Sequence, residues 1–107
     1  MTTAKMSEYA ELIRVGLKDL SNLKKEFDSI EADCGSRNWD GYNATPISHN
    51  ALRSAWDYAS SLPEEIPIPE VTPEPDGEIA LEWYGKDGSV FSISFGEGET
   101  ISYAGLI

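Results

Sequence analysis

Apolar residues recur at steps of three and four along the first third of the chain. This spacing places them on one face of an α-helix, and Gly35 offers the left-handed conformation that commonly ends one. We therefore predict a long amphipathic helix over residues 7–32. Such a helix would be about 37 Å long, which indicates either a kink near Gly16 or pairing of part of the helix with another segment. The apolar stripe consists of Tyr9, Leu12, Ile13, Leu17, Leu20, Leu23, Phe27 and Ile30.

A second, shorter helix is predicted over residues 48–61, after a loop at 36–47. Ser48 is a suitable N-cap and Pro63 ends the helix. The loop contains Trp39 and Tyr42, which are large residues for an exposed segment. They either fold back over the core between the two helices or form an aromatic recognition patch.

Residues 63–77 contain five of the six prolines. Closely spaced prolines remove backbone donors and fix φ, so this segment is predicted to be an extended strap rather than a helix. The apolar residues within it, Ile66, Ile68 and Val71, favour a strap that lies on the domain over a free linker.

Apolar and polar residues alternate over residues 78–104, interrupted by glycine-containing turns at 85–88 and 96–99. This pattern predicts a three-stranded antiparallel meander with one apolar and one polar face. Its third strand would lie at a sheet edge, where it could pair with another chain. The apolar face comprises Ile79, Leu81, Trp83, Phe91, Ile93, Phe95, Ile101 and Tyr103, and the polar face Glu78, Glu82, Tyr84, Ser92, Ser94, Thr100 and Ser102.

The elements together predict an α+β fold in a single domain over residues 1–107. Two N-terminal helices, the first of them long, would pack on one face of the C-terminal meander. A chain of 107 residues with 40% hydrophobic residues can form one core of this kind.

The net charge of −11 is concentrated in the C-terminal part of the chain. Residues 1–62 hold nine acids and seven bases, whereas residues 63–107 hold ten acids and one base, Lys86. Such a charge would repel nucleic acids and anionic membranes. The asymmetry indicates an interaction surface, although the carboxylates could also serve solubility and nothing else.

Residues suited to catalysis or metal binding are sparse. His49 is the one histidine and has no evident nucleophile or base near it in sequence, and Cys34 has no second cysteine for a disulfide or a zinc site. No calcium loop, phosphate-binding loop or dinucleotide-binding loop occurs. We therefore expect a protein that is not an enzyme and takes no cofactor or metal. The absence of a long apolar run or a signal-peptide core predicts a cytoplasmic location.

Several short motifs between residues 38 and 106 together resemble those of a group of small uncharacterised bacterial proteins. Neither an activity nor a set of catalytic residues can be assigned from this resemblance. It is carried by Asn38-Trp39-Asp40-Gly41-Tyr42, Leu62-Pro63 with the prolines after it, Pro75-Asp76-Gly77-Glu78-Ile79-Ala80-Leu81-Glu82-Trp83, and Tyr103-Ala104-Gly105-Leu106.

These patterns favour a partner-binding protein whose acidic half docks on a basic protein surface. One version is an inhibitor that occupies the nucleic-acid site of a defence or DNA-processing enzyme, with carboxylates in place of phosphates. The alternative is a structural or assembly module that forms a homodimer through the long helix or the edge strand. An antitoxin-like role in a gene pair is compatible with both hypotheses. The predicted contact residues are Trp39, Tyr42, Glu64, Glu65, Glu70, Glu74, Asp76, Glu78, Glu82 and Tyr84.

Overall fold

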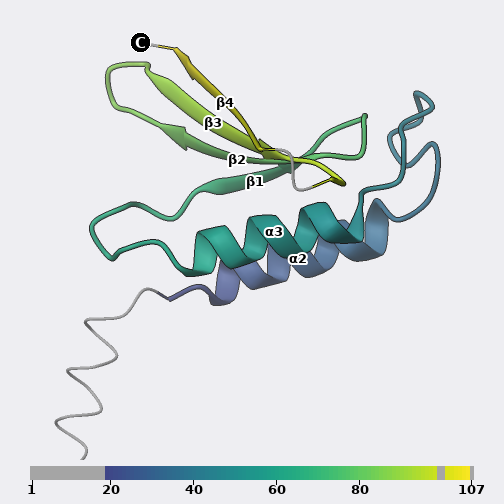
Figure 1. Ribbon diagram of the computed structural model, residues 1–107, viewed down its shortest axis with the longest axis horizontal. Coiled ribbons are helices and arrows are strands. Elements are labelled where there is room, and N and C mark those ends of the chain that lie inside the picture. The colour runs from purple at the N-terminus through teal and green to yellow at the C-terminus, as the bar shows by residue number, and fades with distance from the viewer. Residues whose placement is uncertain (1–18, 99–100, 107) are drawn as a thin grey trace, which may run out of the picture.

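The protein has an α+β fold in which a pair of helices lies against a four-stranded antiparallel sheet (Figure 1). The computed structural model describes residues 19–98 and 101–106. The helices are α2 (Ser21–Asp33) and α3 (His49–Ser60), and the strands are β1 (Glu70–Pro73), β2 (Ile79–Tyr84), β3 (Val90–Phe95) and β4 (Ile101–Leu106). The strands follow one another in the sheet in chain order.

The predicted fold is wrong in the number of strands. The sheet has a fourth strand, β1, which comes from the segment predicted to be a proline-rich strap and pairs with β2 from Glu70–Glu82 to Pro73–Ile79. β1 is a short edge strand, a position that tolerates proline because one side of the strand makes no ladder hydrogen bonds. The predicted meander is therefore the larger part of an up-and-down sheet of four strands.

The prediction of one long first helix is also wrong. Asp19 and Leu20 are not helical, and α2 begins at Ser21 and has 13 residues. The Asp19 carboxylate accepts hydrogen bonds from both the backbone N–H and the hydroxyl of Ser21. Such a local turn competes with helix continuation. The rest of the predicted helix, residues 7–18, lies outside the described residues.

Helix α3 occupies the segment predicted for the second helix. The Ser48 hydroxyl accepts a hydrogen bond from the backbone N–H of Ala51, as expected of an N-cap. One face of α3 packs on β2 and β3, while α2 packs on β1 and on α3. This places both helices on one face of the sheet, which we call the inner face.

The core lies between the helices and the inner face of β2 and β3. Ile79, Leu81, Ile93 and Phe95 are less than 2% exposed. Trp83 is half-buried, whereas Phe91 and Ile101, also on the inner side, are exposed. The side chain of Tyr103 lies outside the described residues. The helical part of the core consists of Leu23, Phe27, Ile30, Ala51, Leu52, Ala55 and Ala59.

The same type of turn closes two successive hairpins. In the first, the Gly77 N–H bonds the carbonyl of Glu74 and the Asp76 carboxylate accepts from the Glu78 N–H. In the second, Gly88, Gly85, Asp87 and Ser89 make the corresponding bonds. Both glycines have positive φ, as three-residue hairpin loops of this kind require.

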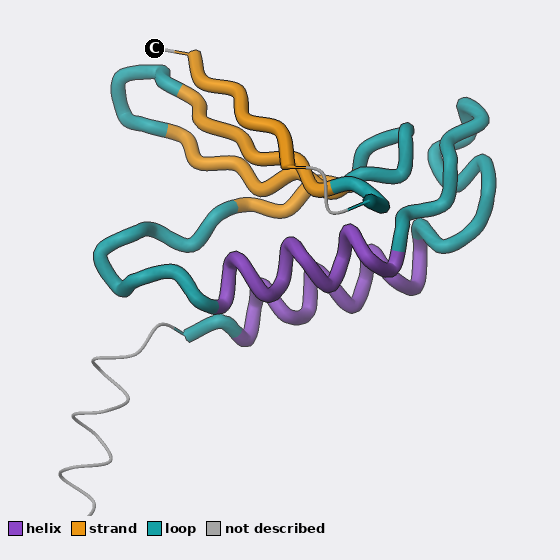
Figure 2. The backbone as a smooth tube through the Cα atoms, viewed as in Figure 1, coloured by secondary structure: helices purple, strands orange, loops and turns teal. Residues whose placement is uncertain are grey.

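The loop before α3 lies at the same end of the molecule as the β1–β2 hairpin (Figure 2). The Thr45 N–H bonds the carbonyl of Pro75, and the Ser48 N–H bonds the carbonyl of Gly77. At the other end of the sheet, the Trp83 indole N–H donates to the carbonyl of Pro67 over 2.7 Å, which holds the segment before β1 against β2.

Candidate functional site

The face of the sheet turned away from the helices carries a group of acidic side chains on β1 and β2. Strand alternation turns Glu70, Glu82 and Tyr84 to this side, because Val71, Leu81 and Trp83 between them face the helices. Glu70 and Glu82 are cross-strand partners in the β1–β2 ladder. The two carboxylates therefore project from directly opposite positions on one face.

Two of the glutamates are held in place by hydroxyl groups of neighbouring strands. The Thr72 hydroxyl on β1 donates to Glu82 over 2.7 Å, and the Ser94 hydroxyl on β3 donates to Glu74 over 2.7 Å. Hydrogen bonds to an ionised acceptor are stronger than neutral ones. Glu82 and Glu74 are therefore oriented on the sheet by contacts within the folded protein itself.

Tyr84 extends this group toward the β2–β3 hairpin. Its side chain is 57% exposed. The pKa of its hydroxyl is raised, first by partial removal from water, then by the charge of Glu82, a hydrogen bond to Glu82 and the charge of Glu70. Glu70, Glu82 and Tyr84 thus form one electrostatic group. With Glu74 we call it the outer acidic face.

A second acidic group surrounds the β1–β2 hairpin. The pKa of Glu78 is raised, first by loss of solvent and then by the charges of Asp76 and Glu74. Glu78 and Asp76 also line a groove of about 370 Å³ together with Glu97, Thr45 and Ser48. The amide of Asn50 donates to Glu97 over 3.3 Å. The hairpin therefore gathers four carboxylates, of which Glu74 belongs to the outer acidic face as well.

The remaining predicted contact residues lie elsewhere. Trp39 is half-buried against the core, and its indole N–H donates to the carbonyl of Thr45 over 2.7 Å, so it covers the core as one interpretation expected. Tyr42, in the same loop, is 89% exposed. Glu64 and Glu65 are exposed in the turn that follows α3. The structure thus places six of the ten predicted residues in two acidic groups that share Glu74, and Trp39, Tyr42, Glu64 and Glu65 stand apart from them.

Sequence reasoning missed three residues that take part in these groups. Thr72 and Ser94 orient the carboxylates, and Glu97 joins Asp76 and Glu78. The Pro75-Asp76-Gly77 turn could have identified Thr72, because a turn of that composition between Val71 and Ile79 is a hairpin signal. The position of Glu97 depends on how the loop after β3 approaches α3, for which the sequence carries no signal.

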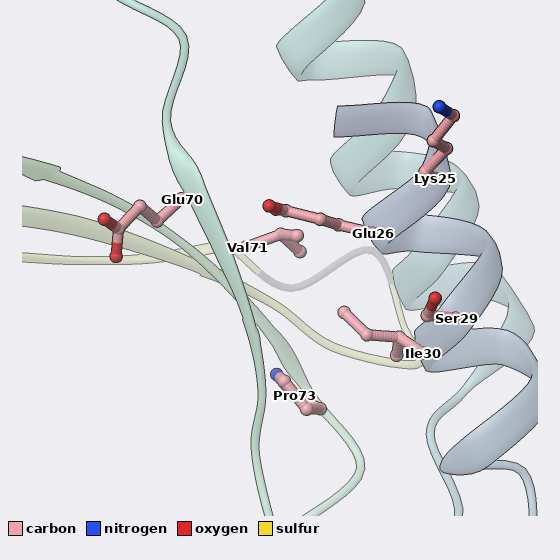
Figure 3. A pocket seen from close by; sticks show the side chains of 7 residues that line it. All are labelled: Lys25, Glu26, Ser29, Ile30, Glu70, Val71 and Pro73. Atoms are coloured by element: carbon pink, nitrogen blue, oxygen red, sulfur yellow. The ribbon is translucent and has the colours of Figure 1, made fainter. Parts of the chain in front are cut away.

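A groove of about 450 Å³ lies between α2 and β1 (Figure 3). Ile30 and Glu26 project from α2 toward the strand and Val71 projects toward the helix, whereas the Glu70 carboxylate lies on the opposite side of β1 (Figure 3). The groove thus opens on the helix side of β1, and Glu70 belongs both to its lining and to the outer acidic face. The volume suits a small ligand, but the lining offers a hydrophobic floor open to solvent and no nucleophile paired with a base.

A smaller groove of about 210 Å³ between the helices contains His49 together with Asp28 and Glu31. Asp28 is occupied by an ion pair with Lys24 at 2.6 Å. Cys34 is buried, and the pKa of its thiol is raised by burial and then by the charge of Asp33, which disfavours the reactive thiolate. Neither His49 with its neighbouring carboxylates nor Cys34 has the geometry of an activated nucleophile.

Within residues 19–98 and 101–106, no three His, Cys, Asp or Glu side chains are arranged to hold a metal ion. The helices of this part of the chain are too short and too polar to cross a lipid bilayer. Comparisons with protein-family models, with curated protein sequences and with solved structures found no match.

Proposed function

We propose that the protein acts by binding a basic surface of another protein through the outer acidic face. The observation that carries this proposal is the opposition of Glu70 and Glu82. Like charges directly across a β-ladder destabilise the sheet, and the one ion pair among the described residues, Lys24–Asp28, lies on α2. Lysine or arginine side chains of a partner would supply the missing counter-charge.

The orientation of the carboxylates supports the same proposal. Binding costs free energy when flexible side chains must be ordered at an interface. Thr72 and Ser94 already hold Glu82 and Glu74 by hydrogen bonds. Part of that ordering cost is therefore met in the folded protein itself.

Tyr84 adds the kind of residue that anchors protein interfaces. Tyrosine is enriched among residues that dominate binding free energies, because it presents a large rigid ring and a polar hydroxyl. Tyr84 is exposed beside Glu82 and Glu70. An arginine of the partner could pair with the carboxylates and stack on this ring.

The partner class that best fits these features is a protein that handles nucleic acids. Such proteins carry clusters of lysine and arginine that bind phosphates. The carboxylates of the outer acidic face, two of them held by hydrogen bonds, offer such proteins a similar array of negative charge. Binding there would make the protein an inhibitor or regulator of its partner.

The test compares two variants of equal charge in affinity capture from the native host. Glu70→Gln/Glu82→Gln removes two charges from the outer acidic face, and the control Glu31→Gln/Asp57→Asn removes two from exposed helical positions. We expect a basic protein to be captured by the wild type and the control, with affinity reduced about tenfold or more by the outer-face variant. The affinity should also weaken as salt rises.

The proposal fails if the captured partner binds both variants and the wild type equally. It also fails if binding does not change between low and high salt, because an interface built on carboxylates must respond to screening.

A further inference from the structure

The two edge strands of the sheet, β1 and β4, differ in how well they are protected against pairing with another chain. The folding of a single copy does not require this difference. β1 is short, with four residues. It begins with the charged Glu70, directly after Pro69, and ends with Pro73. It is also covered on its inner side by α2. These are the features by which natural proteins prevent edge strands from pairing with other chains.

β4, at the opposite edge, has none of these features. It has six residues, Ile-Ser-Tyr-Ala-Gly-Leu, without proline and without charge. It contacts β3 and, within the described residues, no helix. Figure 1 shows it as the strand farthest from α2 and α3. Among the described residues no strand pairs with its outer backbone N–H and C=O groups, and such an edge is ready for pairing with another chain.

We infer that the protein forms a homodimer in which β4 pairs antiparallel with β4 of a second copy. The two four-stranded sheets then become one continuous sheet of eight strands. A twofold axis perpendicular to the sheet relates the copies, so the interface uses the same residues on both sides.

The charge distribution makes β4 the edge at which a second copy can approach with least repulsion. A chain with a net charge of −11 repels another copy wherever their acids approach. β4 is uncharged, and its described neighbours on β3 are uncharged too. In the dimer, Glu82 of one copy and Glu82 of the other are five strand spacings apart, about 24 Å. This exceeds the Debye length of about 8 Å at physiological salt, so their repulsion is screened.

The exposed apolar side chain of Ile101 supports the same interface. Ile101 is 43% exposed, although its ladder partner Phe95 is 1% exposed. A second β4 alongside would cover the edge-facing side of Ile101. The dimer would also place both outer acidic faces on the same side of the sheet, because the twofold axis is perpendicular to it. A partner would then meet two acidic faces.

The inference is tested with the full chain by sedimentation velocity over a wide range of protein concentration. The edge variant is Ser102→Glu/Ala104→Glu. Both residues are exposed and lie opposite Ser94 and Ser92 on β3. In the proposed dimer the two outer faces lie on the same side of the sheet. The edge variant therefore places the new glutamates of one copy close to those of the other across the twofold axis. The control Asn22→Glu/Ser29→Glu adds the same charge at exposed positions of α2.

We expect the wild type and the control to be dimers and the edge variant to dissociate at least about tenfold more readily. Circular dichroism checks that the variant remains folded. Hydrogen exchange of the wild type gives a second measurement that needs no variant, since the β4 amides should exchange more slowly as the concentration rises.

A wild type that stays monomeric at every concentration overturns the inference. So does a dimer that the edge variant leaves intact, or one that the control disrupts equally, which would place the interface on the helices. None of these results bears on the binding of a basic partner, because the outer acidic face lies on β1 and β2 and is complete in one copy.

Discussion

Glu70 and Glu82 lie directly opposite each other on β1 and β2, and both project from the face that the helices leave open. Two carboxylates in that relationship repel each other. Replacement of Glu70 by glutamine should therefore stabilise the fold by about 0.2–1 kcal/mol. Urea denaturation at low salt measures this gain. It should shrink at high salt because screening weakens the repulsion in the wild type.

Glu31→Gln is the control for this change, since Glu31 is exposed on α2 and away from the sheet. A loss of stability in Glu70→Gln would show that Glu70 is held by favourable contacts. It would also remove the argument that the pair is retained for binding.

The hydrogen bond from Trp83 to Pro67 attaches the segment between α3 and β1 to the sheet. Trp83→Phe keeps an aromatic ring near Phe91, whose ring centroid is 5.9 Å from that of Trp83, but removes the donor. We expect a loss of about 1–2 kcal/mol in the free energy of unfolding and faster proteolysis within residues 63–69. Equal proteolysis of the variant and the wild type would mean that other contacts hold this segment.

Gly77 and Gly88 occupy equivalent positions in the two hairpins but differ in their surroundings. A Cβ on Gly77 would lie 2.9 Å from the carbonyl oxygen of Pro46, whereas one on Gly88 would meet nothing within 4 Å. Gly88→Ala should cost about 1–2 kcal/mol for a left-handed backbone alone. Gly77→Ala should cost more, because the loop before α3 must also move.

Thermal or urea denaturation of the two alanine variants measures that difference. Equal losses would contradict it and would show that the contact between the hairpin and the loop is easily rearranged.

Glu78 makes the stability depend on pH in a defined direction. Its pKa in the folded protein lies above the ordinary value of 4.5, because of lost solvent and the charges of Asp76 and Glu74. The folded state therefore keeps the Glu78 proton to higher pH than the unfolded state does. Well below pH 4.5 Glu78 is protonated in both states and does not lower the free energy of unfolding. Its destabilising effect appears as the pH rises through the pKa that Glu78 has in the folded protein.

Glu78→Gln should accordingly be more stable than the wild type at neutral pH and equal to it well below pH 4.5. Urea denaturation of both proteins across this range isolates the effect of Glu78, since the other acids titrate in both. A difference that grows toward low pH would have the wrong sign and would contradict the assigned cause.

Ser48 caps α3 through its bond with the Ala51 N–H. Ser48→Ala should cost about 1 kcal/mol, within a range of 0.5–2 kcal/mol for such caps. Ser29→Ala, at an exposed position within α2, should change the free energy of unfolding little. If both serine variants behave alike in denaturation experiments, the cap does not limit stability.

The segment around Asp19 and Ser21 shows why the helix prediction failed. The three- and four-residue periodicity continues through Leu17 and Leu20, so it shows no end of the helix at Asp19, and only the predicted length indicated a possible kink, near Gly16. The break arises because the Asp19 side chain binds the Ser21 N–H and hydroxyl, an alternative that local polar residues offer to the backbone. Periodicity records which side chains are apolar, whereas such a bond depends on one particular rotamer.

The chain sequence by itself determined the alternation that forms β2, β3 and β4, the serine that caps α3, and the glycine turn between β2 and β3. These features depend on neighbours in sequence, and local sterics and side-chain period are sufficient to specify them. The tertiary structure decided that Glu70–Pro73 is a strand, that Glu70 lies opposite Glu82, and that Thr72 and Ser94 orient the carboxylates. Those relationships follow from ladder register and from contact between distant segments, and the free energy that fixes them comes from burial of the whole inner face.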